Sequence, residues 1–414
     1  MPRPQNARVR LLSRGFTLLP ILLTALGWPA VVSSFLTFVH HHPQQAQATS
    51  RSGGQALRRC SRLPRKALAV APPVANPQGV ENRLWQWRGQ SIRYQMLGEK
   101  QDGPSVLLVH GLFVNADHWR QNMPALAAAG FRVFAIDLLG YGYSSKPAPY
   151  GSTGKSLNGE NGRDLQPKEA EIGAADGTSW RKTLVELKHP LGSPYNFYTW
   201  SEQLRDFTKE VIGAQQTTLV ANSIGSISAL QAAIDDPDLY NGVFIVNPNF
   251  RELHVTEQPD FLVPVTTSVQ SLLREYGKGL FDFLATPDTV TTILKEPYYN
   301  ASQVTPELVD VLLTPLLIEG SAEVVFDTLS YSAGPLPEQQ LADPGLRCPV
   351  RICWGEEDPW TPCARVRALE RFSSVDDVLP LKGIGHCPHD EAPDVVNPLI
   401  INFVQNLHAQ RDEK

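Results

Sequence analysis

The sequence predicts an α/β fold with a doubly wound, mostly parallel sheet, and three features of its pattern support this. Four short apolar runs bounded by turn residues are typical of strands buried on both faces of a parallel sheet. They lie at 106–109, 133–136, 219–221 and 243–246. Amphipathic stripes of helical period accompany the runs, as at Trp200, Leu204, Phe207 and Val211. An apolar helical block at 250–335 then interrupts the alternation. In such a fold, sites lie at the carboxyl ends of the strands.

Length and charge divide the chain into a basic leader and an acidic body. The chain has 414 residues, which is enough for one large α/β domain with additions. Ten of the 37 basic residues and none of the 42 acidic ones lie in residues 1–80, and the first acid is Glu81. The body after residue 80 is therefore acidic and has no electrostatic reason to bind nucleic acid or an anionic bilayer.

The leader, residues 1–80, combines an uncharged run at 15–39 with an acid-free, arginine-rich stretch at 51–66. The run fits a signal peptide and the stretch fits a transit peptide, and in series they resemble the bipartite leaders of algal plastids. We therefore expect a plastid location. A single plastid or mitochondrial transit peptide is an alternative. An uncleaved anchor in contact with a membrane is another, because the run is long enough to span a bilayer.

Two segments interrupt the core, which we expect at 81–249 and 336–414. Residues 148–197 are rich in Gly, Ser and charged residues and have no sustained period. They are expected to form a flexible insertion that is dispensable for folding. Residues 250–335 have apolar helical stripes directly after a strand. This second segment is expected to be a lid over the site.

Ser223 is the candidate nucleophile. It lies in Val-Ala-Asn-Ser-Ile-Gly at 220–225, which ends the fifth expected strand and opens a helix-like run. A serine on such a sharp strand-to-helix turn presents its hydroxyl above the sheet. The usual pattern is Gly-x-Ser-x-Gly, and Ala221 replaces its first glycine. A serine here could also be a helix N-cap, but its position after the fifth strand favours the nucleophile.

The base and the acid are expected after the serine, in the order acid and then histidine. Asp358 follows the strand-like run at 350–354, and His386 lies in a glycine-rich turn after the last expected strand. Glu356 and Glu357 compete as acids, and His389 competes as the base. Because only a neutral imidazole accepts the serine proton, activity is expected to fall on acidification.

Backbone N–H groups are expected to stabilise the oxyanion of the tetrahedral intermediate. The candidates are the N–H of Ile224 after the nucleophile and that of Leu112 in the loop after the third strand. Gly111 allows that loop to turn tightly, and His110 is expected to orient it. Asn222 is a supporting residue before the nucleophile.

Neither a metal nor a cofactor is expected. The four cysteines beyond the leader have no zinc spacing with histidine and are expected to be reduced thiols; they are Cys348, Cys353, Cys363 and Cys387.

Residues 81–410 resemble the α/β-hydrolase superfamily. The resemblance rests on His-Gly at 110–111, on the segments 117–119, 137–144 and 354–360, and on the turns of the candidate nucleophile and base. Gly-His-Cys-Pro-His-Asp-Glu at 385–391 is similar to the corresponding segment of the pheophytinases and their plastid relatives, as is Asn222. This resemblance implies cleavage of the phytyl ester of pheophytin by a Ser-Asp-His mechanism. Ala221 and Ser226 depart from the pattern.

The expected function is hydrolysis of a bulky, apolar carboxylic ester. Ser223 argues against haloalkane dehalogenases and epoxide hydrolases, which use an aspartate nucleophile. Carbon–carbon bond hydrolases remain an alternative because they also have Asn before the serine, although an aromatic residue usually stands where this chain has Cys387. The sequence is also compatible with a general carboxylesterase and with a non-catalytic ligand-binding protein on the hydrolase fold.

Overall fold

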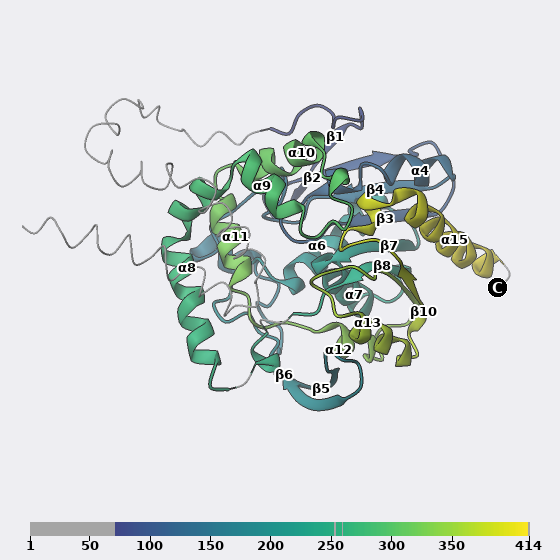
Figure 1. The fold of residues 1–414 in the computed structure, drawn as a ribbon. Coiled ribbons are helices and arrows are strands. Elements are labelled where there is room, and N and C mark those ends of the chain that lie inside the picture. Colours follow the sequence, from purple (N-terminus) through teal and green to yellow (C-terminus); the bar gives the residue numbers. More distant parts are fainter. Residues whose placement is uncertain (1–70, 252–253, 259, 413–414) are drawn as a thin grey trace, which may run out of the picture. The chain divides into compact units, whose positions relative to one another are not determined.

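An eight-stranded sheet organises the computed structural model, which describes residues 71–251, 254–258 and 260–412 (Figure 1). The strands lie in the order β1-β2-β4-β3-β7-β8-β9-β10. β1 and β2 pair antiparallel, β2 pairs antiparallel with β4, and the remaining pairs are parallel. The doubly wound, mostly parallel sheet expected from the sequence is confirmed. The bounds are β1 (Asn82–Trp87), β2 (Gln90–Leu97), β3 (Ser105–Val109), β4 (Arg132–Ile136), β7 (Thr217–Ser223), β8 (Tyr240–Pro248), β9 (Val350–Gly355) and β10 (Val375–Leu381).

The sheet lies in a unit formed by residues 70–259 and 270–414, whereas residues 260–269 group with residues 1–69 in a second unit. Of the second unit, the structure describes only 260–269, which include the first turns of α8 (Val263–Leu284). The expected leader at 1–80 therefore lies almost entirely outside the described residues. Among the described residues, no helix is both long and apolar enough to cross a membrane.

Helices cover both faces of the sheet. Side chains of β3 alternate between two apolar clusters, with Leu107 and Val109 in one and Val106 and Leu108 in the other. α6 (Phe197–Phe207) and α7 (Ile224–Asp235) pack in the first cluster, and α4 (Met123–Ala128) and α15 (Pro393–Asp412) pack in the second. Strands that are buried on both faces need apolar side chains at every position, which explains their continuous apolar runs.

The block at 250–335 is helical, as expected, and lies between β8 and β9. We call it the cap; that it acts as a lid remains a prediction. It contains η4 (Val255–Glu257), α8, α9 (Pro287–Leu294), η5 (Ala301–Gln303), α10 (Pro306–Leu316) and α11 (Ser321–Leu329). The remaining short helices belong to the core: η2 (Ala116–Trp119), η3 (Thr208–Ile212), α12 (Pro337–Leu341), α13 (Cys363–Arg367), η6 (Ala368–Arg371) and α14 (Pro388–Glu391).

Residues 148–197 differ from the expectation that they lack regular structure. They form α5 (Gly151–Leu157) and a two-stranded hairpin of β5 (Lys168–Gly173) and β6 (Trp180–Val185). The inward side chains of the hairpin, including Ile172 and Val185, pack with Tyr198 and Leu336 in an apolar cluster. An isolated hairpin is marginal in water, and this one is stabilised by packing on the core. So few inward positions produce little periodicity in the sequence, which is why the hairpin was missed.

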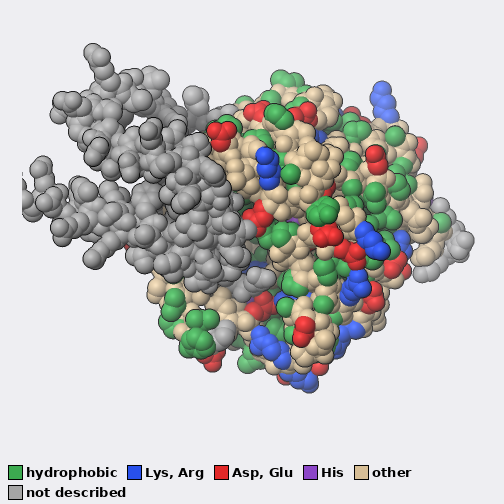
Figure 2. Space-filling model, in the orientation of Figure 1, with side chains coloured by type: hydrophobic (Ala, Val, Ile, Leu, Met, Phe, Trp, Pro, Cys, Tyr) green, Lys and Arg blue, Asp and Glu red, His purple; other side chains and the backbone are tan. Residues whose placement is uncertain are grey.

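The exposed face is electrostatically mixed. Figure 2 shows acidic and basic side chains interspersed on the visible face of the described residues. Ion pairs at the surface of the described residues include Arg88 with Glu202 at 2.7 Å and Arg367 with Glu356 at 2.7 Å. Exposed pairs of this kind contribute little to stability, so the apolar clusters dominate the free energy of folding.

The hairpin should contribute measurably to stability. Ile172 is 2% exposed, whereas Leu184 on the same hairpin is 64% exposed. Ile172→Ala should lower the free energy of unfolding by about 2–4 kcal/mol because it leaves a cavity. Leu184→Ala should change it by less than about 0.5 kcal/mol. Urea denaturation measures both, and equal, small effects would show that the segment is dispensable after all.

Candidate active site

Ser223 has a strained backbone at the junction of β7 and α7. Its φ of 51° and ψ of −123° lie in a region that residues other than glycine rarely adopt. Such strain costs on the order of 1–3 kcal/mol and is typical of functional sites. The two departures from the usual pattern have structural explanations. Ala221 packs in an apolar cluster of the sheet, and the hydroxyl of Ser226 donates a hydrogen bond to the carbonyl of Ser223 at 2.6 Å.

The loop after β3 lies directly against this turn. A Cβ at Gly225 would lie 2.5 Å from the carbonyl oxygen of His110, and one at Gly111 would lie 3.3 Å from the Cβ of Ser223. Only glycine permits the first contact. The close approach brings the loop that carries the candidate Leu112 N–H beside the candidate nucleophile.

The structure brings Asp358 and His386 together, although 28 residues separate them. The Nδ1 of His386 lies 2.6 Å from Oδ2 of Asp358, and both residues are buried. The other carboxylate oxygen accepts hydrogen bonds from the backbone N–H groups of Trp360 at 2.8 Å and Thr361 at 3.2 Å. Burial alone would raise the pKa of Asp358, but the charge and hydrogen bonds of His386 and this loop lower it. The carboxylate is therefore held ionised beside the imidazole.

The competing side chains lie elsewhere. Glu356 pairs with Arg367, and Glu357 is exposed. His389 is buried, and its Nε2 lies 3.2 Å from Nδ1 of His118. Asp358 and His386 thus form the one hydrogen-bonded acid–histidine pair found among these candidates in the described residues.

Sequence reasoning missed Asn247, which holds the acid from a third strand. Asn247 is the residue before the end of β8 and has a φ of 50°, a conformation that Asn tolerates better than most residues. Its Nδ2 donates to Oδ2 of Asp358 at 2.6 Å, and its Oδ1 accepts from the N–H of Gly355 at 3.1 Å. Its position at the carboxyl end of a predicted strand was the signal available in the sequence.

Asn222 connects the turn of Ser223 to two neighbouring segments. Its Nδ2 donates to the carbonyl of Val246 at 3.0 Å and lies 3.5 Å from the carbonyl of His386. The side chain therefore links the candidate nucleophile's turn to β8 and to the turn of the candidate base.

The candidate oxyanion donors follow β3 and β7. His110 is buried, and its Nδ1 donates to the carbonyl of Gly111 at 2.7 Å while its Nε2 accepts from the N–H of Leu138 at 3.0 Å. Burial lowers the pKa of His110, so the ring stays neutral and this tautomer is fixed. Leu112 follows directly after His110 and Gly111, whose positions these hydrogen bonds fix. Ile224 is the first residue of α7.

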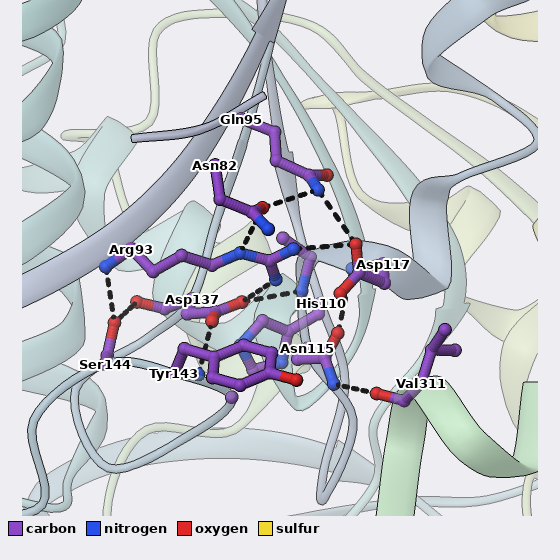
Figure 3. Close-up of polar contacts among 12 residues, drawn as sticks. Asn82, Arg93, Gln95, His110, Asn115, Asp117, Asp137, Tyr143, Ser144 and Val311 are labelled. Carbon is purple, nitrogen blue, oxygen red and sulfur yellow. Dashed lines mark hydrogen bonds and ion pairs between the residues drawn. The ribbon is translucent and has the colours of Figure 1, made fainter. Parts of the chain in front are cut away.

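A buried charge network supports the loops behind the site (Figure 3). Arg93 on β2 lies 2.7 Å from Asp117 and 3.1 Å from Asp137, with all three side chains almost fully buried. Asp137 also accepts hydrogen bonds from the N–H groups of Ala116 and Tyr143. Burial alone would lower the pKa of Arg93, but the two carboxylates outweigh it and raise the pKa. The network fixes the loops after β3 and β4 relative to one another.

No group of three or more His, Cys, Asp or Glu side chains within the described ranges is arranged to hold a metal ion. The four cysteines of the described chain are free.

The fold and the site define a class of protein. The family model for the alpha/beta hydrolase family matches residues 106–399. The chain therefore belongs to the alpha/beta hydrolase family.

Among its curated relatives is the chloroplastic pheophytinase of Arabidopsis thaliana, which is 26% identical over 337 residues. That match covers 77% of this chain and 65% of the relative, so the chain spans slightly less than two thirds of that protein's length. The bifunctional epoxide hydrolase 2 of Rattus norvegicus is 53% identical over 49 residues, which are 12% of this chain and 9% of that protein.

Solved structures share the fold. The wild-type Cfl2 structure from Burkholderia cenocepacia has a TM-score of 0.56 at 15% identity, covering 81% of this chain and all of that one. CarC, a serine hydrolase involved in carbazole degradation, has a TM-score of 0.54 at 16% identity and covers 79% of this chain and 99% of that one. At such identities the likeness concerns the fold alone.

Proposed function

We propose that the protein is a hydrolase that cleaves carboxylic esters through Ser223, with His386 as the base and the carboxylate of Asp358 orienting that base. One observation supports the proposal most strongly. The strained turn of Ser223 lies at the carboxyl end of β7, and the hydrogen-bonded pair of His386 and Asp358 follows the carboxyl ends of β10 and β9 in the same sheet. Serine is a poor nucleophile until a base accepts its proton. The imidazole is that base, and the buried carboxylate stabilises the imidazolium as it forms.

Each step has a residue to perform it. His386 uses Nδ1 to bond Asp358, which leaves Nε2 to accept the proton of the Ser223 hydroxyl. The oxygen of Ser223 attacks the ester carbonyl, and the backbone N–H groups of Leu112 and Ile224 stabilise the oxyanion. His386 then protonates the leaving alcohol, and water hydrolyses the acyl-enzyme by the same path in reverse.

The proposed substrate is a bulky apolar ester, such as the phytyl ester of pheophytin. The pheophytinase relative supports it, although fold alone does not determine the substrate. The cap supports it too, because a small cavity between the loop after β3 and helices α10 and α11 has a largely apolar lining that includes Phe113, Leu312, Leu316 and Val324. None of the three proposed triad residues lines this cavity, so we propose that the cap helices move to admit the ester.

We further propose a plastid location. The acid-free, arginine-rich leader supports it, as does the chloroplastic relative. If the leader remains attached, the uncharged run at 15–39 would hold the enzyme at a membrane.

The triad is tested by three single variants. Ser223→Ala should abolish covalent labelling by a fluorophosphonate. His386→Ala should lower kcat on a p-nitrophenyl ester roughly 10³–10⁶-fold, because the serine loses its base. His389→Ala, three residues further along in α14, is the matched control and should lose far less. Wild-type activity should also fall on acidification. Labelling of Ser223→Ala, or an active His386→Ala beside an inactive His389→Ala, would refute the assignment.

The substrate is tested by product analysis. The purified enzyme should convert pheophytin to pheophorbide and free phytol, detected by liquid chromatography, and Ser223→Ala should not. Turnover of short p-nitrophenyl esters alone would indicate a general carboxylesterase. Cleavage of a vinylogous diketone would indicate a carbon–carbon bond hydrolase, and no turnover or labelling at all would indicate a binding protein.

The location is tested with a fluorescent protein fused to residues 1–80. The fusion should accumulate in plastids of algal cells. Fluorescence that stays in the cytosol, is secreted or enters mitochondria would contradict the proposal.

A further inference from the structure

A short cap segment, residues 296–300 between α9 and η5, runs along the loops of Asp358 and His386. We call it the strap. On the acid loop, the indole Nε1 of Trp360 donates to Oε1 of Glu296 at 2.9 Å. On the base turn, the backbone N–H of His386 donates to the carbonyl of Pro297 at 2.7 Å. The cap therefore forms hydrogen bonds both to the loop of Asp358 and to the turn of His386.

Glu391 on α14 joins the strap to the turn of His386. One carboxylate oxygen accepts from the N–H of Asn300 on the strap at 2.7 Å. The other accepts from the N–H of Gly385, the residue before His386, at 2.8 Å. Glu391 is buried, and hydrogen bonds to a carboxylate are stronger than those between neutral groups. One side chain thus holds the two segments together.

The strap and the turn lie closer than any side chain would allow. A Cβ at Gly385 would lie 2.2 Å from the carbonyl oxygen of Pro297 and 2.8 Å from the N–H nitrogen of Tyr299. The glycine is therefore required by the strap, and not by the backbone conformation of Gly385 itself, which has no positive φ.

The strap is also anchored independently of Glu391. The hydroxyl of Tyr298 lies 2.9 Å from Nε2 of His118 and donates to Oδ2 of Asp390 at 2.7 Å. Asp390 in turn pairs with Arg120 at 2.5 Å. Burial lowers the pKa of His118 to about 4, so this ring is neutral at ordinary pH. Loss of Glu391 should therefore loosen the turn of His386 without releasing the strap.

We propose that Glu391 is a positioning residue for catalysis, which holds the backbone of His386 against the cap so that its imidazole meets Ser223. The proposal rests on the proposed function of His386. His386 is held at two points. Its Nδ1 is hydrogen-bonded to Asp358, and its backbone N–H is hydrogen-bonded to Pro297 on the strap. Displacement of a catalytic group by about 1 Å can cost on the order of 10²-fold in rate. Catalytic competence thereby depends on a seated cap.

The test compares E391Q with E370Q, which makes the same change at an exposed glutamate on η6. In E391Q the amide nitrogen cannot accept a hydrogen bond, so one of the two N–H partners is lost. The kcat of E391Q on a short p-nitrophenyl ester should fall about ten-fold or more, with KM within about two-fold of wild type. The rate of fluorophosphonate labelling should fall in proportion. E370Q should match the wild type in all three.

A purely structural role for Glu391 predicts a different result. Stability would then fall while the kcat of the folded E391Q stayed within about two-fold of wild type, and this outcome overturns the proposal. Hydrogen exchange supplies a second readout, because the N–H groups of Gly385 and His386 should exchange faster in E391Q than in E370Q. Unchanged exchange also counts against it.

Two further variants separate the remaining outcomes. If E391Q does not fold, E391D keeps the carboxylate on a side chain one methylene shorter, which cannot reach the N–H groups of both Asn300 and Gly385. Its kcat should fall several-fold with KM unchanged, and a wild-type kcat overturns the proposal. Ser223→Ala distinguishes this failure from failure of the proposed function. If Ser223→Ala is unlabelled while E391Q behaves as wild type, only the role of Glu391 is refuted.

Discussion

The strained backbone of Ser223 is the constraint on which the rest of the site depends. A φ of 51° with ψ of −123° persists only where the surroundings over-determine it. β7 holds this conformation from one side because it is buried between β3 and β8. α7 holds it from the other side because the helix begins at the next residue. The glycines at 111 and 225 let the loop after β3 approach, and Asn222 links the turn to β8. The apolar core thus offsets the strain at its edge.

Around this edge, buried charges are compensated by opposite charges, and these ion pairs fix the loops. Arg93 with Asp117 and Asp137 fixes the loops behind the proposed oxyanion donors. Arg120 with Asp390 lies beneath the strap. An unpaired buried charge would cost several kcal/mol, so these loops cannot move apart without a large penalty. Rigid loops of this kind keep the side chains that they carry in place.

Much of the core could be predicted because it depends on local pattern. Apolar runs identified the parallel strands, and the stripe through Trp200 and Leu204 identified α6. The positions of Asp358 and His386 were predicted from the chain order serine, acid, histidine and from the strand-like runs before them. The hydrogen bond between the two side chains agrees with that prediction. The contacts of Asn247 and Glu391 could not be found in this way. Glu391 joins distant segments through backbone N–H groups, which leave no signature in the side-chain pattern. For Asn247 the only signal in the sequence was its place at a strand end, and its bond to Asp358 depends on how three strands lie together. The hairpin at 168–185 was missed because its buried face is too short to show a period.

The strain at Ser223 can be measured directly as stability. Ser223→Gly removes the Cβ that opposes the observed φ and ψ, whereas Ser223→Ala retains it. Glycine also loses about 0.4–1 kcal/mol through the greater entropy of the unfolded chain. We nevertheless expect Ser223→Gly to be more stable than Ser223→Ala by about 1 kcal/mol or more in urea denaturation. If Ser223→Ala is as stable as Ser223→Gly, or more stable, the turn is not strained and the central claim is contradicted.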